Sequence, residues 1–334
     1  MSKPAILVIG GAGYIGSHMV LDLLRADYPV ITLDNLARGH RELVAGGDFV
    51  EGDLGDPAVL DRVFSRYPVK AVMHFAAWSL VGESVEKPLA YYRNNVASTI
   101  TLLEAMQRHG IRHFIFSSTA AVYGEPQQTP ITEAHPCSPT NPYGATKLAV
   151  ERLLADVSAT SDLTCSILRY FNAAGADAEG VIGERHRPET HLIPLVLQVA
   201  TGERDAITIF GEDYPTPDGT CLRDYIHVSD LTRAHLLALE ALLNGGGNTT
   251  YNLGNSSGYS VRQVIETARE ITGHPIPVRT TERRAGDPAV LIADSSRIRD
   301  ELGWKPRYER LDDIIRTAWN WHRREAGLCD ESER

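Results

Sequence analysis

The chain has 334 residues, of which 43% are hydrophobic and 23% charged, a composition typical of a globular protein with a sizeable core. Its formal net charge of −10 argues against nucleic acid, which binds to a broad positive field. No apolar run approaches the roughly 18 residues that a membrane span needs, and the N-terminus lacks the basic start and apolar run of a signal peptide. We therefore expect a cytoplasmic protein with neither a membrane nor a nucleic-acid partner.

The cysteines and histidines point to no disulfide and no metal site. Cys137, Cys165, Cys221 and Cys329 are far apart and form no C-x-x-C pair, so we expect free thiols. The twelve histidines show no metal-ligand spacing. His74 lies inside an apolar run, where a core histidine without a chemical role is expected.

Short apolar runs alternate with longer amphipathic segments in the first half of the chain. Strands are expected at Ala5–Ile9, Val30–Leu33, Phe49–Val50, Ala71–Phe75, Phe114–Phe116 and Cys165–Leu168. Because these runs are apolar throughout, they fit a parallel sheet covered on both faces. Helices are expected between them, at Ile15–Ala26 and Pro88–His109. The alternation predicts an α/β fold with a doubly wound parallel sheet of the Rossmann type.

The pattern weakens after about residue 175. Loops rich in glycine and polar residues are expected at Gly175–Pro188 and Gly211–Gly219, and helices at Val228–Leu243, Val261–Thr272 and Leu311–Arg323. We expect a first domain over residues 1–175 and a smaller α/β region over 176–334. Residues 225–255, approximately, are expected to pack back against the first domain.

A glycine-rich turn follows the first strand. Gly10, Gly13 and Gly16 give the spacing G-x-x-G-x-x-G between a strand and a helix. Such glycines allow a tight turn, let a pyrophosphate approach the backbone, and permit close packing of helix on strand. The helix that follows offers free N–H groups and the positive end of its dipole. This context predicts a dinucleotide site in the first domain.

The end of the second strand indicates which dinucleotide binds. Asp34 stands there, where a carboxylate accepts hydrogen bonds from the adenosine ribose and repels the extra phosphate of NADP. Arg38, four residues on, could soften that preference. We expect NAD.

A tyrosine and a lysine lie four residues apart near the middle of the chain. Apolar residues at Val150, Leu153, Leu154 and Val157 predict a helix that begins near Pro142, so Tyr143 and Lys147 share one face. A lysine ammonium about 5 Å from the phenol would contribute roughly 3 kcal/mol and lower its pKa by about two units. The positive nicotinamide ring of oxidised NAD would add to this effect. Tyr143 is therefore expected to accept a hydroxyl proton near neutral pH, with Thr119 as a bridge to the substrate.

Together these residues resemble the extended short-chain dehydrogenase/reductase family, and in particular its members that invert carbon 4 of UDP-hexoses. Stretches similar to those members recur along nearly the whole chain. They include GGAGYIGSH at 10–18, VGESVEKPL at 81–89, FSSTAAVYGE at 116–125, NPYGATK at 141–147, LRYFNAAGA at 168–176, IFGEDYPTPDGTCLRDYIHV at 209–228 and RRAGDPA at 283–289.

The resemblance implies a role for each site residue. Catalysis would involve Tyr143, Lys147 and Thr119. NAD would be bound by Gly10, Gly13, Tyr14, Ile15, Gly16, Asp34, Asn35, Asp53, Leu54, Phe75, Ala76, Asn94, Ser117, Tyr143, Lys147 and Phe171. The UDP-hexose would be bound by Thr119, Asn172, His191, Leu192, Phe210, Arg223, Arg284, Asp287 and Leu291. The resemblance also implies a homodimer formed through Pro88–His109 and the Tyr143–Val157 helix.

Some positions depart from the family pattern. Thr119 replaces a serine that many members have, so Ser118 is an alternative proton relay. Ser79 replaces a lysine near the cofactor in some members, and His191 an asparagine that contacts the substrate. Leu291 stands where some members place a bulky tyrosine that limits hexose size, so N-acetylated hexoses are expected to fit as well.

The implied reaction is a redox epimerisation. Tyr143 takes the proton of the 4-hydroxyl while NAD takes the hydride, and the hydride then returns to the opposite face of the 4-keto sugar. A 4,6-dehydratase is the nearest alternative, but its acid/base pair would be replaced here by Ala120 and Ala121. A nucleotide-sugar oxidoreductase that releases reduced cofactor, and a non-catalytic NAD sensor, are further alternatives.

Overall fold

The computed structural model describes residues 3–284 and 287–328. Its strands are β1 Ala5–Ile9, β2 Val30–Asp34, β3 Asp48–Glu51, β4 Val69–His74, β5 His113–Thr119, β6 Thr164–Tyr170, β7 Asn172–Ala174, β8 Ile207–Phe210, β9 Leu222–His227, β10 Thr249–Leu253, β11 Gly258–Ser260, β12 Val278–Thr281 and β13 Val290–Leu291. Its α-helices are α1 Tyr14–Arg25, α2 Pro57–Arg66, α3 Val81–Glu86, α4 Pro88–Tyr92, α5 Ser98–Arg108, α6 Pro142–Thr160, α7 Leu192–Ala200, α8 Val228–Leu243, α9 Val261–Thr272, α10 Ser296–Leu302 and α11 Leu311–Glu325.

The main sheet has seven parallel strands in the order β10-β6-β5-β4-β1-β2-β3. The order reverses direction between β1 and β4, because the chain runs outward from β1 to β3 and then crosses to β4. Both β1 and β2 are fully buried, since helices cover the two faces of the sheet. In such sheets ligands bind beyond the carboxyl ends of the strands at the reversal.

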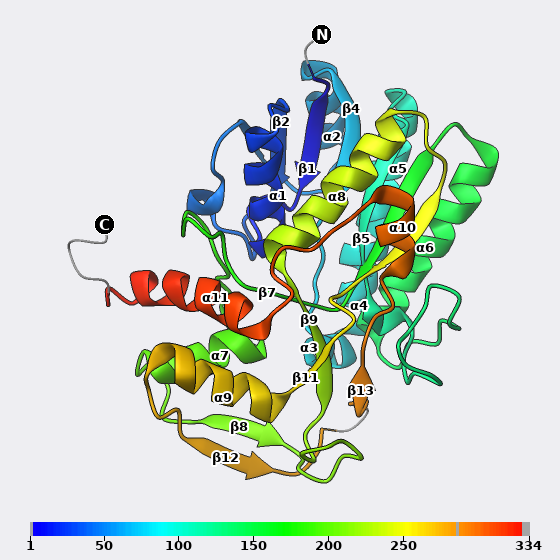
Figure 1. Ribbon diagram of the computed structural model, residues 1–334. Coiled ribbons are helices and arrows are strands. Elements are labelled where there is room, and N and C mark those ends of the chain that lie inside the picture. Colours follow the sequence, from blue (N-terminus) through cyan, green and yellow to red (C-terminus); the bar gives the residue numbers. More distant parts are fainter. Residues whose placement is uncertain (1–2, 285–286, 329–334) are drawn as a thin grey trace.

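Two apolar cores flank this sheet. One lies under α1, α8 and α10, and the other under α2, α5 and α6. α8 therefore packs against the main sheet and α1 although it follows β9 in the sequence, and β10 adds an edge strand beside β6. Figure 1 shows α8 crossing the sheet beside α1.

A smaller part lies beyond the carboxyl edge of the sheet. Here α7, α9 and α11 pack together and β8 pairs with β12, around a third core. Figure 1 shows these elements below the main sheet, joined to it by β7 and β9. β9 pairs with β7, β11 and β13, so it brings the later segments to the end of the sheet.

The predicted doubly wound parallel sheet is confirmed, and each of the six expected strands overlaps an observed one. The expected helix Pro88–His109 is a helical run interrupted by η2, a π-helical segment at Arg93–Ala97. Cys137, Cys165 and Cys221 are free thiols, whereas Cys329 lies outside the described residues. His74 is the core residue expected, 2% exposed and hydrogen-bonded to Thr99. No helix of the described chain has the length and apolar character to cross a bilayer.

Candidate active site

The glycine turn between β1 and α1 leaves no room for side chains at two of its three glycines. Gly10 has φ +78°, and a Cβ there would lie 2.5 Å from the backbone nitrogen of Ala76. A Cβ on Gly16 would lie 2.0 Å from the carbonyl oxygen of Gly10. At Gly13, by contrast, a Cβ would meet only that same oxygen, at 3.4 Å. The turn is therefore tight inside and open at Gly13, the N-cap of α1.

No side chain caps the N-terminus of α1, so its first N–H groups are available to a ligand. Tyr14 turns its side chain away from the turn, because its hydroxyl donates to the Gly175 carbonyl at 2.7 Å. Tyr14 as a whole is 6% exposed, and its ring lies edge-on to the ring of His186. Any contact of Tyr14 with a dinucleotide is thus expected to come from its backbone.

Asp34 lies beside this turn at the end of β2. Its carboxylate accepts the Ala12 N–H at 3.0 Å and the Leu36 N–H at 2.8 Å. Burial raises the pKa of Asp34, and the two N–H donors oppose that shift. The Arg38 guanidinium donates a hydrogen bond to the Glu83 carboxylate at 2.5 Å and lies over the Trp78 ring. It therefore does not offset the charge of Asp34.

The other residues expected at the cofactor lie along the same edge. Asn35 donates to Asp53 at 2.8 Å, next to the buried Leu54. Asn94 lies in the π-helical segment and donates to Asn95 at 2.9 Å. Asn95 is 3% exposed and bonds both the Trp78 backbone and Thr146 of α6. Sequence reasoning missed Asn95, although the widened helical turn around it is a feature often found at functional sites.

The start of α6 packs closely against the end of β5. Asn141 caps α6 through the Gly144 N–H at 2.9 Å, and a Cβ on Gly144 would lie 2.4 Å from the Ala121 carbonyl oxygen. This close approach sets Tyr143 beside Thr119, with which it makes a side-chain hydrogen bond. One helical turn later, the Nζ of Lys147 donates to the Ser117 carbonyl at 2.8 Å. The predicted group of Tyr143, Lys147, Thr119 and Ser117 is therefore brought together.

Burial dominates the acid–base behaviour of this group. It raises the pKa of Tyr143 to about 12, against a smaller opposing effect of Thr119. It lowers the pKa of Lys147 to about 7, although Glu151 favours the charged form. The expected acidification of the phenol by Lys147 is therefore not found in the protein by itself, and the contribution expected from oxidised NAD stays a prediction. The cause is desolvation, which disfavours both charged forms.

The Ser118 hydroxyl is hydrogen-bonded away from Tyr143. Ser118 is 1% exposed and donates to Glu151 at 2.5 Å. Glu151 also forms a buried ion pair with Arg169, which in turn contacts the Tyr123 hydroxyl. This arrangement favours Thr119 over Ser118 as the hydroxyl next to Tyr143.

The residues expected at the substrate come from β7, β9, β13 and the segments around them. Arg223 forms an ion pair with Asp287, and the Arg284 guanidinium lies 3.8 Å from the Phe210 ring centre. Leu291 pairs in register with Arg223 and packs against the cluster that contains Ala120 and Phe171. Asn172 is exposed on β7, which lies beside β9. The two arginines thus lie in the smaller region, while Leu291 joins them to the end of β5.

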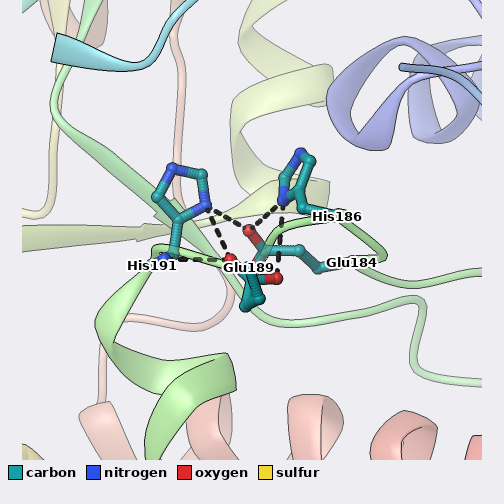
Figure 2. Close-up of side chains that lie close together, drawn as sticks. All are labelled: Glu184, His186, Glu189 and His191. Atoms are coloured by element: carbon teal, nitrogen blue, oxygen red, sulfur yellow. Dashed lines mark hydrogen bonds and ion pairs between the residues drawn. The ribbon is translucent and has the colours of Figure 1, made fainter. Parts of the chain in front are cut away.

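His191 and Leu192 begin α7, and His191 belongs to a cluster that was not expected. Its Nδ1 lies 2.5 Å from Glu184, and His186 and Glu189 complete the group (Figure 2). Burial alone would raise the pKa of Glu184, but His191 and His186 lower it to about 2. Burial alone would lower the pKa of His186, but Glu184 and Glu189 raise it to about 10. The sequence carries a signal for this group, two glutamates and two histidines within eight residues, that the search for histidine spacing missed.

The glycine turn, the acidic residue at the end of β2 and the tyrosine–lysine pair define a dinucleotide-binding enzyme of the short-chain dehydrogenase/reductase type. The sequence model of the NAD dependent epimerase/dehydratase family matches residues 6–254. The chain belongs to this family, as the sequence resemblance predicted.

Relatives are similar over nearly the whole chain. The UDP-glucose 4-epimerase of Halalkalibacterium halodurans is 54% identical over 319 residues, which cover 96% of each chain. The UDP-glucose 4-epimerase structure from Brucella ovis in complex with NAD is 49% identical, with a TM-score of 0.93 and coverage of 95% of this chain and 98% of that one. The Bifidobacterium longum enzyme in complex with NAD+ and UDP is 40% identical, with a TM-score of 0.91 and coverage of 97% and 100%.

Proposed function

We propose that this chain is an NAD-dependent isomerase that interconverts UDP-glucose and UDP-galactose by inverting carbon 4 of the hexose. The observation that carries the proposal is the placement of Tyr143 against Thr119, one helical turn before the buried Lys147 and at the same sheet edge as the glycine turn. Relatives of the same length and about half-identical sequence, named UDP-glucose 4-epimerases, support it.

The residues present fit NAD. The open face at Gly13 and the uncapped start of α1 suit a pyrophosphate, and Asp34 suits the adenosine ribose. Oxidised NAD, when bound, would supply a hydride acceptor for the sugar and a positive charge that favours the phenolate of Tyr143. The division into an NAD-binding domain, residues 1–175, and a substrate-binding region, 176–334, is part of the proposal.

Side chains of the protein itself accept and relay the hydroxyl proton of the sugar. Thr119 is placed to relay the hydroxyl proton of the sugar to the phenolic oxygen of Tyr143. Lys147 holds its ammonium one helical turn away, where it favours the phenolate. A dehydratase would need proton donors after Thr119, but Ala120 and Ala121 carry none. The nearby side chains therefore suit reversible oxidation without elimination of water.

The nucleotide end of the substrate is assigned to the smaller region. Arg223 and Arg284 present planar guanidinium groups suited to pyrophosphate oxygens, with Phe210 beside the base. Asn172, His191, Leu192 and Asp287 complete this part of the proposal. Tight binding of the nucleotide leaves the hexose free to turn over between the two half-reactions.

The direct test uses purified protein, UDP-galactose and no added NAD. UDP-glucose should appear, because the cofactor ends each cycle in its starting form and stays bound. Net release of reduced nicotinamide, with no UDP-glucose, would instead identify an oxidoreductase. Formation of a 4-keto-6-deoxy sugar would identify a dehydratase.

Acceptance of N-acetylated hexoses is a second, finer proposal. Leu291 leaves more space than a tyrosine at the position next to Arg223. Wild-type protein should convert UDP-N-acetylglucosamine, and Leu291→Tyr should lose that activity by about tenfold or more while it keeps UDP-glucose turnover. No turnover of the acetylated substrate by the wild type would rule the proposal out.

A homodimer is also part of the proposal. Val81, Val85, Leu89, Tyr92 and Ile100 are exposed on neighbouring segments from α3 to α5, and Leu89 is 80% exposed. Such a patch fits a second copy of the chain. Sedimentation should give a dimer for the wild type and a monomer for Leu89→Glu, whereas a wild-type monomer would contradict it. The cytoplasmic location stays a prediction from the sequence.

A further inference from the structure

Four potential metal ligands meet in the segment that joins β7 to α7. Glu184, His186, Glu189 and His191 each offer one nitrogen or oxygen, and these atoms all lie within 4.8 Å of one another. Figure 2 shows the His191 and His186 rings on opposite sides of the group, with the carboxylate oxygens of Glu184 and Glu189 between them. The cluster lies outside the tyrosine–lysine site and shares only His191 with the residues proposed to bind the substrate.

The separations between the atoms fit a small four-coordinate ion. His191 Nδ1 and His186 Nδ1 lie 2.5 and 3.2 Å from Glu184 Oε1, and the nearest Glu189 oxygens lie 3.8 and 3.6 Å away. Bonds of about 2.0–2.1 Å in a tetrahedral site place neighbouring ligand atoms about 3.3 Å apart. The observed separations bracket that spacing, so small side-chain adjustments would bring all four atoms into range.

One ligand atom has two carboxylates within ion-pair distance but makes no hydrogen bond with either. The Nδ1 of His186 is buried and makes no hydrogen bond of good geometry. It faces Glu184 and Glu189, whose side chains are each 4% exposed. Buried polar atoms are rarely left in this state, so an unsatisfied one calls for an ion or another explanation.

The backbone around the cluster is held in place. The Trp321 indole donates to the Glu184 carbonyl at 3.1 Å. Glu189 Oε1 accepts the N–H groups of Thr190 and His191 at 2.7 and 2.9 Å, which leaves Oε2 directed to His186. Outer contacts of this kind orient metal ligands.

We propose that Glu184, His186, Glu189 and His191 bind one divalent transition-metal ion of the Zn²⁺ type. Mixed imidazole and carboxylate ligands suit such an ion, and its two positive charges balance the two buried carboxylates. The ring of His186 lies edge-on to the ring of Tyr14 at the start of α1, with 6.2 Å between the two ring centroids. The ion therefore holds the loop before α7 in contact with that ring. His191 uses Nδ1 for this contact, so Nε2 on the half-exposed ring stays free for the substrate.

The first experiment measures Zn²⁺ bound to the holoenzyme. Protein is treated with a chelator, desalted, supplied with zinc chloride, desalted again and analysed for metal. Wild type should retain about one Zn²⁺ per chain, and Glu184→Gln and His186→Gln should bind at least tenfold more weakly. His109→Gln is the matched control, since His109 is also partly buried beside a carboxylate, Asp61, but stands alone. Its retention should equal that of the wild type.

Failure of the wild type to retain Zn²⁺, or equal retention in the cluster variants, overturns the proposal and leaves the group as an ion-pair network. A second measurement needs no variant and so does not depend on how the variants fold. Wild-type protein loaded with Co²⁺ should show the intense visible absorption of a four-coordinate ion. The weak spectrum of hydrated Co²⁺ would overturn the proposal too. Neither readout involves turnover, so both are independent of the epimerase assignment.

Discussion

Burial disfavours the charged forms in two polar groups of this protein, but only one of the groups overcomes that effect. Around Tyr143 burial disfavours the charged forms, because it raises the pKa of the phenol to about 12 and lowers that of Lys147 to about 7. In the cluster before α7 the charged forms dominate, with the pKa of Glu184 near 2 and that of His186 near 10. The difference is the presence of opposite charges at hydrogen-bonding distance in the second group only.

The reaction centre, unlike the cluster, depends on a charge that the protein alone does not provide. Desolvation moves Tyr143 away from the pKa that a general base needs at neutral pH. A positive charge next to the phenol would reverse that shift, and the proposed NAD site lies at the same sheet edge. We infer that the tyrosine becomes a competent base only in the complex with oxidised cofactor, whereas the glutamate–histidine cluster needs no cofactor to hold its charges.

The largest effect is expected at the phenol. Tyr143→Phe removes the proton acceptor and should lower turnover of UDP-galactose about 10³-fold, in the range of general acid–base catalysis. NAD should stay bound, which release of nucleotide from denatured protein measures. Tyr67→Phe is the control, since Tyr67 is the C-cap residue of α2 and belongs to neither proposed binding site, and it should keep normal turnover. Near-normal activity of Tyr143→Phe would contradict the assignment of the base.

A smaller effect is expected at the buried ion pair behind Ser118. Glu151→Gln leaves the Arg169 guanidinium buried without a counter-charge and should lower the free energy of unfolding by about 3 kcal/mol. Urea unfolding measures the change. Asp162→Asn breaks an exposed ion pair with Arg112 and should change stability little. Equal losses in the two variants would show that burial does not set the strength of these pairs.

The smallest effect is a pH dependence in the glutamate–histidine cluster, measured with a chelator present. The pKa of His186 is raised above its unfolded value, so its contribution to stability is complete below about pH 6.5 and is lost as the pH rises through about 10. The difference in unfolding free energy between wild type and His186→Gln should therefore shrink by at least about 1 kcal/mol over that range. A constant difference would mean that His186 is not held charged.

The parts of the fold that depend on neighbours in the sequence could be predicted. The glycine turn, the strand before it and Asp34 all lie within β1–α1–β2, and Tyr143 and Lys147 are one helical turn apart. The return of β10 to the sheet beside β6, and the role of β9 in joining β7, β11 and β13, depend on pairings between distant segments. Their short runs carry little periodicity of their own.

Contacts in the site also depend on segments that are distant in the sequence. Asn95 bonds residues on either side of it in the chain, and Arg169 pairs with Glu151 across α6 and β6, so neither contact follows from a local pattern. The pKa of Tyr143 depends on how many atoms surround the phenol, which spacing along a helix does not give. The glutamate–histidine cluster is local in sequence, but only the fold of the loop brings its four side chains to one point.

The most direct test of the account follows a deuterium label on carbon 4 of UDP-galactose. The purified protein, with no NAD added, should give UDP-glucose that keeps the label on carbon 4, because oxidation and reduction occur at one carbon within one site. Loss of the label to solvent, or its release in free reduced cofactor, would contradict the proposed inversion by a retained NAD.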